Sequence, residues 1–218
     1  MRARRRNGFL AALLLLIAGR TGVVRAQKVV DRVVARVEEE VILQSDVEQL
    51  ARYQVLVDGK SESETQILDR LIDQWIVRKE AEASHFTPVS AGDVDRGMSR
   101  LERSFANKED FVAQREKAGI SEAELKQIVT AQAYLSNYLD SRFRPTVQLT
   151  EEAIHDFYNQ RVIPRAKERG QEPPSFDAAR DLILEVLIQQ GINEQADKWL
   201  KESRARLSIT KFLNEVGA

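Results

Sequence analysis

The pattern Ser-x-x-Glu or Ser-x-x-Asp recurs along the chain, each time just before apolar residues at helical spacing. In such a capping box the serine hydroxyl accepts the backbone N–H three residues on, and the acidic side chain accepts the N–H of the serine. The pairs are Ser45 with Glu48, Ser61 with Glu64, Ser90 with Asp93 and Ser121 with Glu124. They predict a mainly α fold, with helices at about 45–57, 61–84, 108–117, 121–144 and 176–205 and further helices from Ser90 and Thr150. Pro164 should break or kink the helix that Thr150 begins.

Two short segments are typical of strands instead. Residues 28–37 are rich in valine, and Val41-Ile42-Leu43 follows after three glutamates. A hairpin of two strands is marginal in water, so it needs a third strand or a helix against it. Leu207-Ser208-Ile209-Thr210 alternates apolar and polar residues. We therefore predict that about 206–213 pairs with the hairpin and ties the two ends of the mature chain together, the alternative being a frayed tail.

The first 26 residues have the parts of a secretory signal peptide. Arg2, Arg4, Arg5 and Arg6 precede an apolar core at Phe9 to Ala18, and Val24-Arg25-Ala26 offers a cleavage site. That core is short for a permanent membrane-spanning helix. We expect cleavage after Ala26 and a periplasmic mature protein, and the alternative is an uncleaved membrane anchor.

The charge of the mature chain argues against nucleic acid as a partner. The signal segment holds six arginines and no acid, so its removal leaves 27 bases against 34 acids and a net charge of −7. Binding to a phosphate backbone needs clustered Lys and Arg. Contact with a membrane is expected only through the signal segment, if it stays uncleaved.

The residues offer little for catalysis, and we expect no enzyme, no cofactor and no metal site. There is no cysteine, and only two histidines, His85 and His155, are present. Glu152 and His155 form one Glu-x-x-His pair, whereas a di-metal helical bundle needs two such pairs and more carboxylates. The sequence also lacks a nucleophile elbow, a phosphate-binding glycine loop and a zincin motif.

A cluster of aromatic residues is the best candidate for contact with another polypeptide. Tyr134 and Tyr138 are four residues apart on the helix expected at 121–144, and Phe143 ends that helix before Pro145. Exposed aromatic side chains suit sequence-tolerant contact with apolar peptide segments. Most aromatics at helical spacing belong to a core instead, and the sequence leaves that alternative open.

The segment Val29 to Val47 resembles the opening of mature SurA-type periplasmic chaperones. It has a valine-rich strand, a polar turn, a short apolar strand and a Ser-Asp helix start, in the order Val-Val-Asp-Arg-Val-Val-Ala-Arg-Val-Glu-Glu-Glu-Val-Ile-Leu-Gln-Ser-Asp-Val. Residues 67–72, the helix expected at 121–144 and the segment from Ser175 to the last strand are similar to later parts of the family's chaperone domain. The resemblance covers about 27–148 and 175–213.

One departure from the family's pattern bears on function. Relatives carry one or two parvulin-type prolyl isomerase domains between the long helix and the closing helix, and such a domain takes on the order of a hundred residues. Here the interval 145–174 is far shorter and holds one histidine and no strand pattern. The resemblance therefore implies an ATP-independent chaperone, or holdase, without the isomerase, which binds unfolded outer-membrane protein precursors.

These expectations divide the chain into four parts. They are a signal peptide at 1–26, a SurA N-terminal-like chaperone domain at 27–148, a helix and linker at 149–174, and a C-terminal helix and strand at 175–218 that complete the chaperone domain. The fold expected is a helical chaperone domain with a small β-sheet made by the N-terminal hairpin and the C-terminal strand. The alternatives for function are a peptidyl-prolyl cis-trans isomerase and a membrane-anchored envelope assembly factor.

Overall fold

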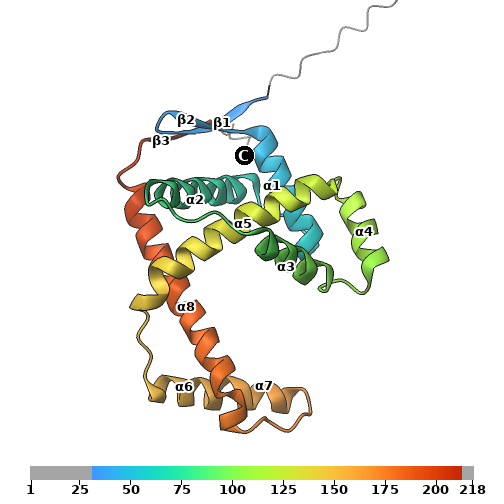
Figure 1. The fold of residues 1–218 in the computed structure, drawn as a ribbon, viewed down its shortest axis with the longest axis vertical. Coiled ribbons are helices and arrows are strands. Elements are labelled where there is room, and N and C mark those ends of the chain that lie inside the picture. Colours follow the sequence, from blue (N-terminus) through green and yellow to red (C-terminus); the bar gives the residue numbers. More distant parts are fainter. Residues whose placement is uncertain (1–30, 213–218) are drawn as a thin grey trace, which may run out of the picture. The chain divides into compact units, whose positions relative to one another are not determined.

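The computed structural model describes residues 31–212, and these form a mainly α fold with one small sheet (Figure 1). This confirms the predicted fold class. The signal segment 1–26, its cleavage point and residues 28–30 and 213 of the predicted strands lie outside the described residues. In chain order the elements are β1 (Val33–Val37), β2 (Glu40–Leu43), α1 (Gln44–Asp58), α2 (Glu64–Ala83), α3 (Ala91–Glu102), α4 (Lys108–Lys117), α5 (Glu122–Phe143), the 3₁₀ turn η1 (Arg144–Thr146), α6 (Glu151–Phe157), the π-helix η2 (Tyr158–Val162), α7 (Ile163–Glu168), α8 (Phe176–Arg204) and β3 (Ile209–Lys211).

The sheet joins the two ends of the described chain. Its strand order is β2-β1-β3, and both pairings are antiparallel. Val37 lies opposite Glu40 in β2 and opposite Ile209 in β3, which places β1 in the middle. Figure 1 shows β3 at the top, beside the hairpin and above α2. The predicted pairing of the last strand with the hairpin is confirmed.

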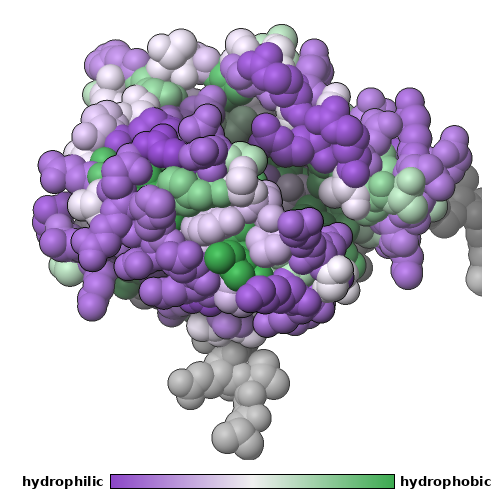
Figure 2. Space-filling model, turned by 90° about the horizontal axis from the view of Figure 1, so that it is seen from below, coloured by the Kyte–Doolittle hydropathy of each residue, from purple (hydrophilic) through white to green (hydrophobic). Residues whose placement is uncertain are grey.

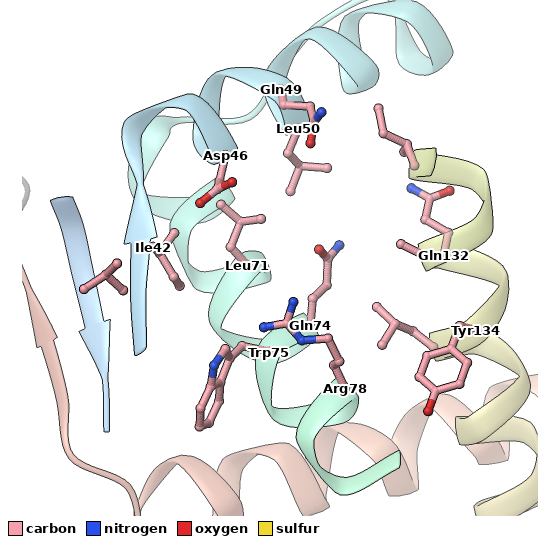
Figure 3. Close-up of a pocket in the computed structure, with 14 residues that line it drawn as sticks. Ile42, Asp46, Gln49, Leu50, Leu71, Gln74, Trp75, Arg78, Gln132 and Tyr134 are labelled. Atoms are coloured by element: carbon pink, nitrogen blue, oxygen red, sulfur yellow. The ribbon is translucent and has the colours of Figure 1, made fainter. Parts of the chain in front are cut away.

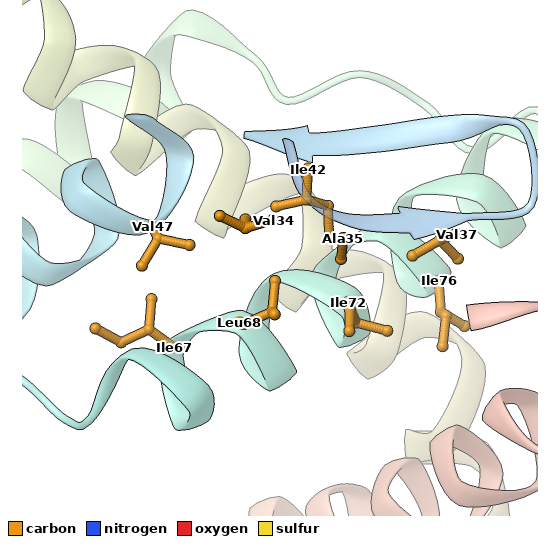
Figure 4. Packing of buried hydrophobic residues seen from close by; sticks show 9 residues of the cluster. All are labelled: Val34, Ala35, Val37, Ile42, Val47, Ile67, Leu68, Ile72 and Ile76. Atoms are coloured by element: carbon orange, nitrogen blue, oxygen red, sulfur yellow. The ribbon is translucent and has the colours of Figure 1, made fainter. Parts of the chain in front are cut away.

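The inner face of the sheet packs on α2. Val34, Ala35, Val37 and Ile42 from the strands meet Ile67, Leu68, Ile72 and Ile76 from the helix, and all are buried (Figure 4). Burying an aliphatic side chain of this size contributes about 1.5–3 kcal/mol. This cluster supplies the support that the short hairpin lacks on its own.

Two helices begin at other residues than the capping boxes predicted. The first turn of α1 is capped by Asp46, whose carboxylate accepts the Leu43 N–H (2.8 Å), while the Ser45 hydroxyl bonds Asp31 instead. At α2 the cap is Ser63, whose N–H donates to the Gln66 side chain (3.1 Å), and not Ser61. The predictions at Ser45 and Ser61 are therefore wrong, because Asp46 and Ser63 take the capping roles. The predicted caps Ser90, Ser121 and Thr150 are confirmed.

A charged clamp fastens the end of α8 and β3 to α2. Arg204 Nη1 lies 2.8 Å from Asp69 Oδ1, and Arg204 Nε lies 2.6 Å from Asp73 Oδ1. Lys211 Nζ of β3 reaches the same Asp69 oxygen at 2.7 Å. One carboxylate thereby holds both a helix and a strand, and we call Asp69, Asp73, Arg204 and Lys211 the closing clamp.

The interval 145–174 is helical throughout its regular elements. It contains η1, α6, η2 and α7, and no strand among its residues. The π-helix η2 lies directly before α7, which has Pro164 near its start. The helical path is therefore irregular next to Pro164, but it continues from α6 through η2 into α7 without the break that was one of the two predicted outcomes. The cluster around Ile154 packs these elements against the first half of α8.

One apolar side chain of α8 faces solvent. Leu182 is 71% exposed, whereas the next residue, Ile183, is buried against Ile154 and Ala179. Ile183 lies four residues from Ala179, so these two form the inward row and Leu182 falls outside it.

Gly191, in the middle of α8, allows a close contact with the chain after α5. A Cβ atom placed at this glycine would lie 2.7 Å from Val147 Cγ1 and 3.0 Å from Val147 Cγ2. Glycine costs helix stability relative to alanine, so this position gives up local stability for close packing.

None of the helices among residues 31–212 combines the length and the apolar character needed to cross a bilayer.

The closing clamp predicts a pH-dependent loss of stability. Burial acts to raise the pKa of Asp69, but hydrogen bonds from Lys211 and Arg204 outweigh it and leave this pKa below its ordinary value. A carboxylate with a lowered pKa stabilises the fold above its unfolded pKa of about 3.9, and the contribution is lost as the pH falls through the folded pKa. Asp69→Asn should therefore lower the free energy of unfolding at pH 7 by about 1 kcal/mol. The difference from the wild type should shrink towards zero as the pH is lowered from 7 to well below about 3.9, through the folded pKa.

Urea denaturation followed by circular dichroism at both pH values measures this effect. Asp181→Asn is the matched control, because the Asp181 side chain is 97% exposed, and it should change the free energy of unfolding by less than about 0.5 kcal/mol. An equal loss for Asp69→Asn at both pH values would contradict the role given to its charge.

The contact at Gly191 predicts a destabilising Gly→Ala substitution within a helix. Gly191→Ala should lower the free energy of unfolding by about 1–3 kcal/mol, because the steric conflict with Val147 exceeds the gain in helix propensity. Thermal denaturation of the single variants and of Gly191→Ala/Val147→Ala measures the coupling, and the double variant should lose less than the sum of the two single losses. Gly92→Ala is the control, since its added Cβ would meet nothing closer than 3.5 Å. A Gly191→Ala variant as stable as Gly92→Ala would refute the prediction.

Candidate functional site

A groove of about 290 Å³ lies among β2, α1, α2 and α5 and opens to solvent. Figure 3 shows Leu50 of α1, Gln74 of α2 and Gln132 of α5 pointing towards the same space. Most of its lining is apolar, with a few amide and charged groups among the apolar side chains. The lining residues are Val41, Ile42, Asp46, Gln49, Leu50, Leu71, Gln74, Trp75, Arg78, Ile128, Ala131, Gln132, Tyr134 and Leu135.

The side of the groove formed by β2 and α2 is held by Glu40, at the start of β2. Its carboxylate accepts the Trp75 Nε1–H at 3.0 Å and pairs with Lys79, and Arg78 lies 3.5 Å away. The hydrogen bonds from Lys79 and Trp75 lower the pKa of Glu40. These contacts fix the hairpin over α2, so the rim of the groove keeps its place.

The opposite side of the groove, formed by α1 and α5, is held by polar contacts between these two helices. The Tyr53 hydroxyl donates to the Gln132 amide oxygen at 2.9 Å, and both Gln49 (3.1 Å) and Arg52 (2.8 Å) donate to Glu124. Burial acts to raise the pKa of Glu124, but these two donors outweigh it and the pKa is lowered. Burial raises the pKa of Tyr53, so its hydroxyl stays a donor at neutral pH. The width of the groove is set by these ties between two helices.

A second cavity, of about 470 Å³, continues the groove along α1 and α2. The two cavities share Leu50, Gln74 and Gln132, so they join at the point where these side chains meet. The second is more polar, and the Arg70–Glu62 ion pair lies on its border. Together the cavities make a passage whose apolar end lies beside β2.

The structure separates the three aromatic residues that the sequence suggested for polypeptide contact. Tyr134 lines the groove and packs on Phe86, with ring centroids 5.7 Å apart. Tyr138 is 4% exposed and meets the same phenylalanine at 5.5 Å. Phe143 is 8% exposed and packs on Trp199 at 5.9 Å. The exposure that contact with a client would need is absent at Tyr138 and Phe143, because α2 and α8 cover that face of α5.

Arg142 reinforces this burial. Its guanidinium lies 4.8 Å from the Trp199 ring centroid, and its Nη1 donates to the Tyr138 hydroxyl at 2.7 Å. A cation over an indole face is a favourable contact. The aromatic cluster therefore serves to join α5 and α8.

The groove residues of α2 were not predicted from the sequence, although a signal for them was present. The apolar residues of this helix form two neighbouring rows at i, i+4 spacing. The row Leu68–Ile72–Ile76 is buried under the sheet, and the row through Leu71 and Trp75 is half-buried and lines the groove. The apolar stripe of α2 is wider than contact with the sheet alone requires, and this width indicates a second contact surface on the helix.

The side chains suited to acid–base or metal chemistry are dispersed. Among residues 31–212, no three His, Cys, Asp or Glu side chains gather as a metal site would need. His85 follows α2 with a φ of 54°, and His155 stacks on Phe176 with ring centroids 3.8 Å apart. Figure 2 shows a face on which polar and charged side chains predominate, with separate apolar areas among them.

Two comparisons with known proteins found no relative on which an interpretation of the groove could be based. No protein-family model matches the chain, and no curated protein matches it. The resemblance to SurA-type chaperones therefore rests on the residues quoted above, and the site rests on its own geometry. The structure offers a groove with apolar walls and amide groups, suited to binding a chain of apolar and amide character.

Proposed function

We propose that this protein is an ATP-independent periplasmic chaperone, a holdase that binds unfolded polypeptides. The observation that carries the proposal is the groove between β2, α1, α2 and α5, with its mainly apolar lining and its polar continuation. Unfolded chains present apolar side chains and backbone amides together, and the groove offers partners for both.

The energetics of such a groove suit reversible holding. Burial of apolar surface contributes about 25 cal/mol per Å² and needs no nucleotide. A groove of this size takes only a few side chains of a client, so each contact is weak and several together give a useful affinity. A client can then leave when its own folding buries the same side chains.

The client class and the compartment come from the sequence. The signal segment 1–26, with cleavage after Ala26, supports an exported protein, and the resemblance to SurA-type chaperones supports outer-membrane protein precursors as clients. The interval 145–174, whose regular elements are helical, supports a chaperone part without a prolyl isomerase. We accordingly propose no catalytic activity.

Aggregation of an unfolded β-barrel protein tests the proposal. The protein at equimolar ratio, without ATP, should suppress light scattering when the client is diluted from urea. Absence of suppression up to a several-fold molar excess would count decisively against a holdase.

A pair of matched variants assigns the effect to the groove. Ile128→Gln places a polar group on a half-buried lining residue and should raise the client Kd about three- to tenfold. Leu182→Gln makes the same kind of change at an apolar residue that is 71% exposed outside the groove, and it should leave the Kd unchanged. Fluorescence anisotropy with a labelled unfolded client measures both. Equal weakening by the two variants would show that the groove is not the binding surface.

A further inference from the structure

The groove lies along an edge of the sheet. Among residues 31–212, β2 has a neighbouring strand on one side only, since the strand order is β2-β1-β3. Both Val41 and Ile42 line the groove, although successive residues of a strand point to opposite faces. A cavity that touches both therefore lies beside the strand, at its outer edge. Val41 is 50% exposed there.

The hydrogen bonds of β1 show which of its backbone groups face β3. The Glu38 N–H donates to the Ser208 carbonyl at 2.9 Å, and the Phe212 N–H donates to the Val34 carbonyl at 2.8 Å. In an antiparallel pair, every second residue of a strand directs its N–H and C=O to the same neighbour. Residue 36 lies midway between 34 and 38, so its backbone groups face β3 as well.

This alternation fixes the outward groups of β2. Arg36 is opposite Thr210 in β3 and opposite Val41 in β2. Because Arg36 directs its backbone groups to β3, it forms with Val41 a pair without mutual hydrogen bonds, and the N–H and C=O of Val41 point away from β1. The edge beside the groove thus presents one donor and one acceptor in the geometry of a strand.

The rest of the groove suits a strand in that position. Leu71 and Trp75 of α2 and Leu135 of α5 are half-buried apolar side chains that line the groove. An added strand beside β2 would direct every second side chain to one face, where such a surface would bury it. The charged groups Asp46 and Arg78 are of opposite sign, and each already has a partner, the Leu43 N–H and Glu40. The groove therefore favours neutral backbone amides and apolar side chains over an ionic ligand.

We propose that the groove binds an extended segment of unfolded polypeptide, apolar at alternate positions, as a fourth strand paired with β2. The inference rests on the proposed function and adds the mode of recognition: backbone hydrogen bonds to Val41 give sequence tolerance, and α2 and α5 select apolar side chains at every second position. A membrane-spanning β-strand of about 9–11 residues has this pattern. It would extend beyond the four residues of β2 and along the passage into the second cavity.

An N-methylation scan of a peptide tests the mode of binding. The probe is a labelled peptide of about ten residues that alternates valine and threonine, with lysines at its ends, and fluorescence anisotropy gives its Kd for the full chain. N-methylation removes one backbone donor at a time. At the central position whose N–H pairs with the Val41 carbonyl it should raise the Kd about tenfold, and at the two adjacent positions, whose N–H groups point away from β2, it should change the Kd less than about twofold. Equal effects at all positions would overturn strand pairing and leave the holdase standing, whereas no binding of the unmethylated peptide would refute both.

Variants of Val41 test the same pairing from the protein's side. Val41→Pro removes the outward N–H without removing a hydrogen bond to β1, and an edge strand accepts proline at such a position. It should raise the peptide Kd about tenfold, while Val41→Ala, which keeps the backbone donor, should raise it no more than about threefold. Circular dichroism checks that both variants fold. If Val41→Pro does not fold, the N-methylation scan of the peptide alone tests the strand pairing. Sedimentation of the chain alone as a dimer that Val41→Pro dissociates would overturn the proposal, because the edge would then serve a second copy.

Discussion

The pairing of β3 with β1 is the contact on which the arrangement of the helices depends. A hairpin as short as β1–β2 does not persist alone in water, and β3 completes it into a sheet that can bury its inner face on α2. The closing clamp adds a charged tie at the same place, because Asp69 bonds both Arg204 and Lys211. With the sheet held on α2, the edge of β2 is presented to the groove that α1 and α5 complete.

Elements governed by local chemistry were predictable from the sequence. The serine and threonine caps at Ser90, Ser121 and Thr150 start helices where expected, because no neighbour competes for their role. The predictions at Ser45 and Ser61 failed because Asp46, in the first turn of α1, accepts the Leu43 N–H, and because Ser63 directly precedes α2 and caps it. The pairing of the last strand was predictable as well, since an unsupported hairpin needs a partner and few other segments alternate.

The site was less predictable, because its residues are apolar and helical like those of any core. The spacing of Tyr138 and Phe143 along α5 fits an exposed stripe and a buried stripe equally well. Only the packing of α2 and α8 against α5 decides that these two side chains are covered. The groove is a property of how far α5 stands from α2 and β2. The ties Tyr53–Gln132 and Arg52–Glu124 hold α5 against α1 across distant parts of the chain, and periodicity along one helix cannot report such contacts.

The turn after α7 has a consequence for how chains of this architecture can diversify. Residues 169–175 contain no helix or strand, and Gly170 has a φ of 65° with no atom within 4 Å of an added Cβ. The helices before this turn pack on the first half of α8, whereas the sheet and the closing clamp engage its last turn. Lengthening a surface loop costs only about 0.6 kcal/mol per doubling. The turn is therefore a suitable insertion site, where evolution or protein engineering can add a folded domain while β3 stays paired with β1.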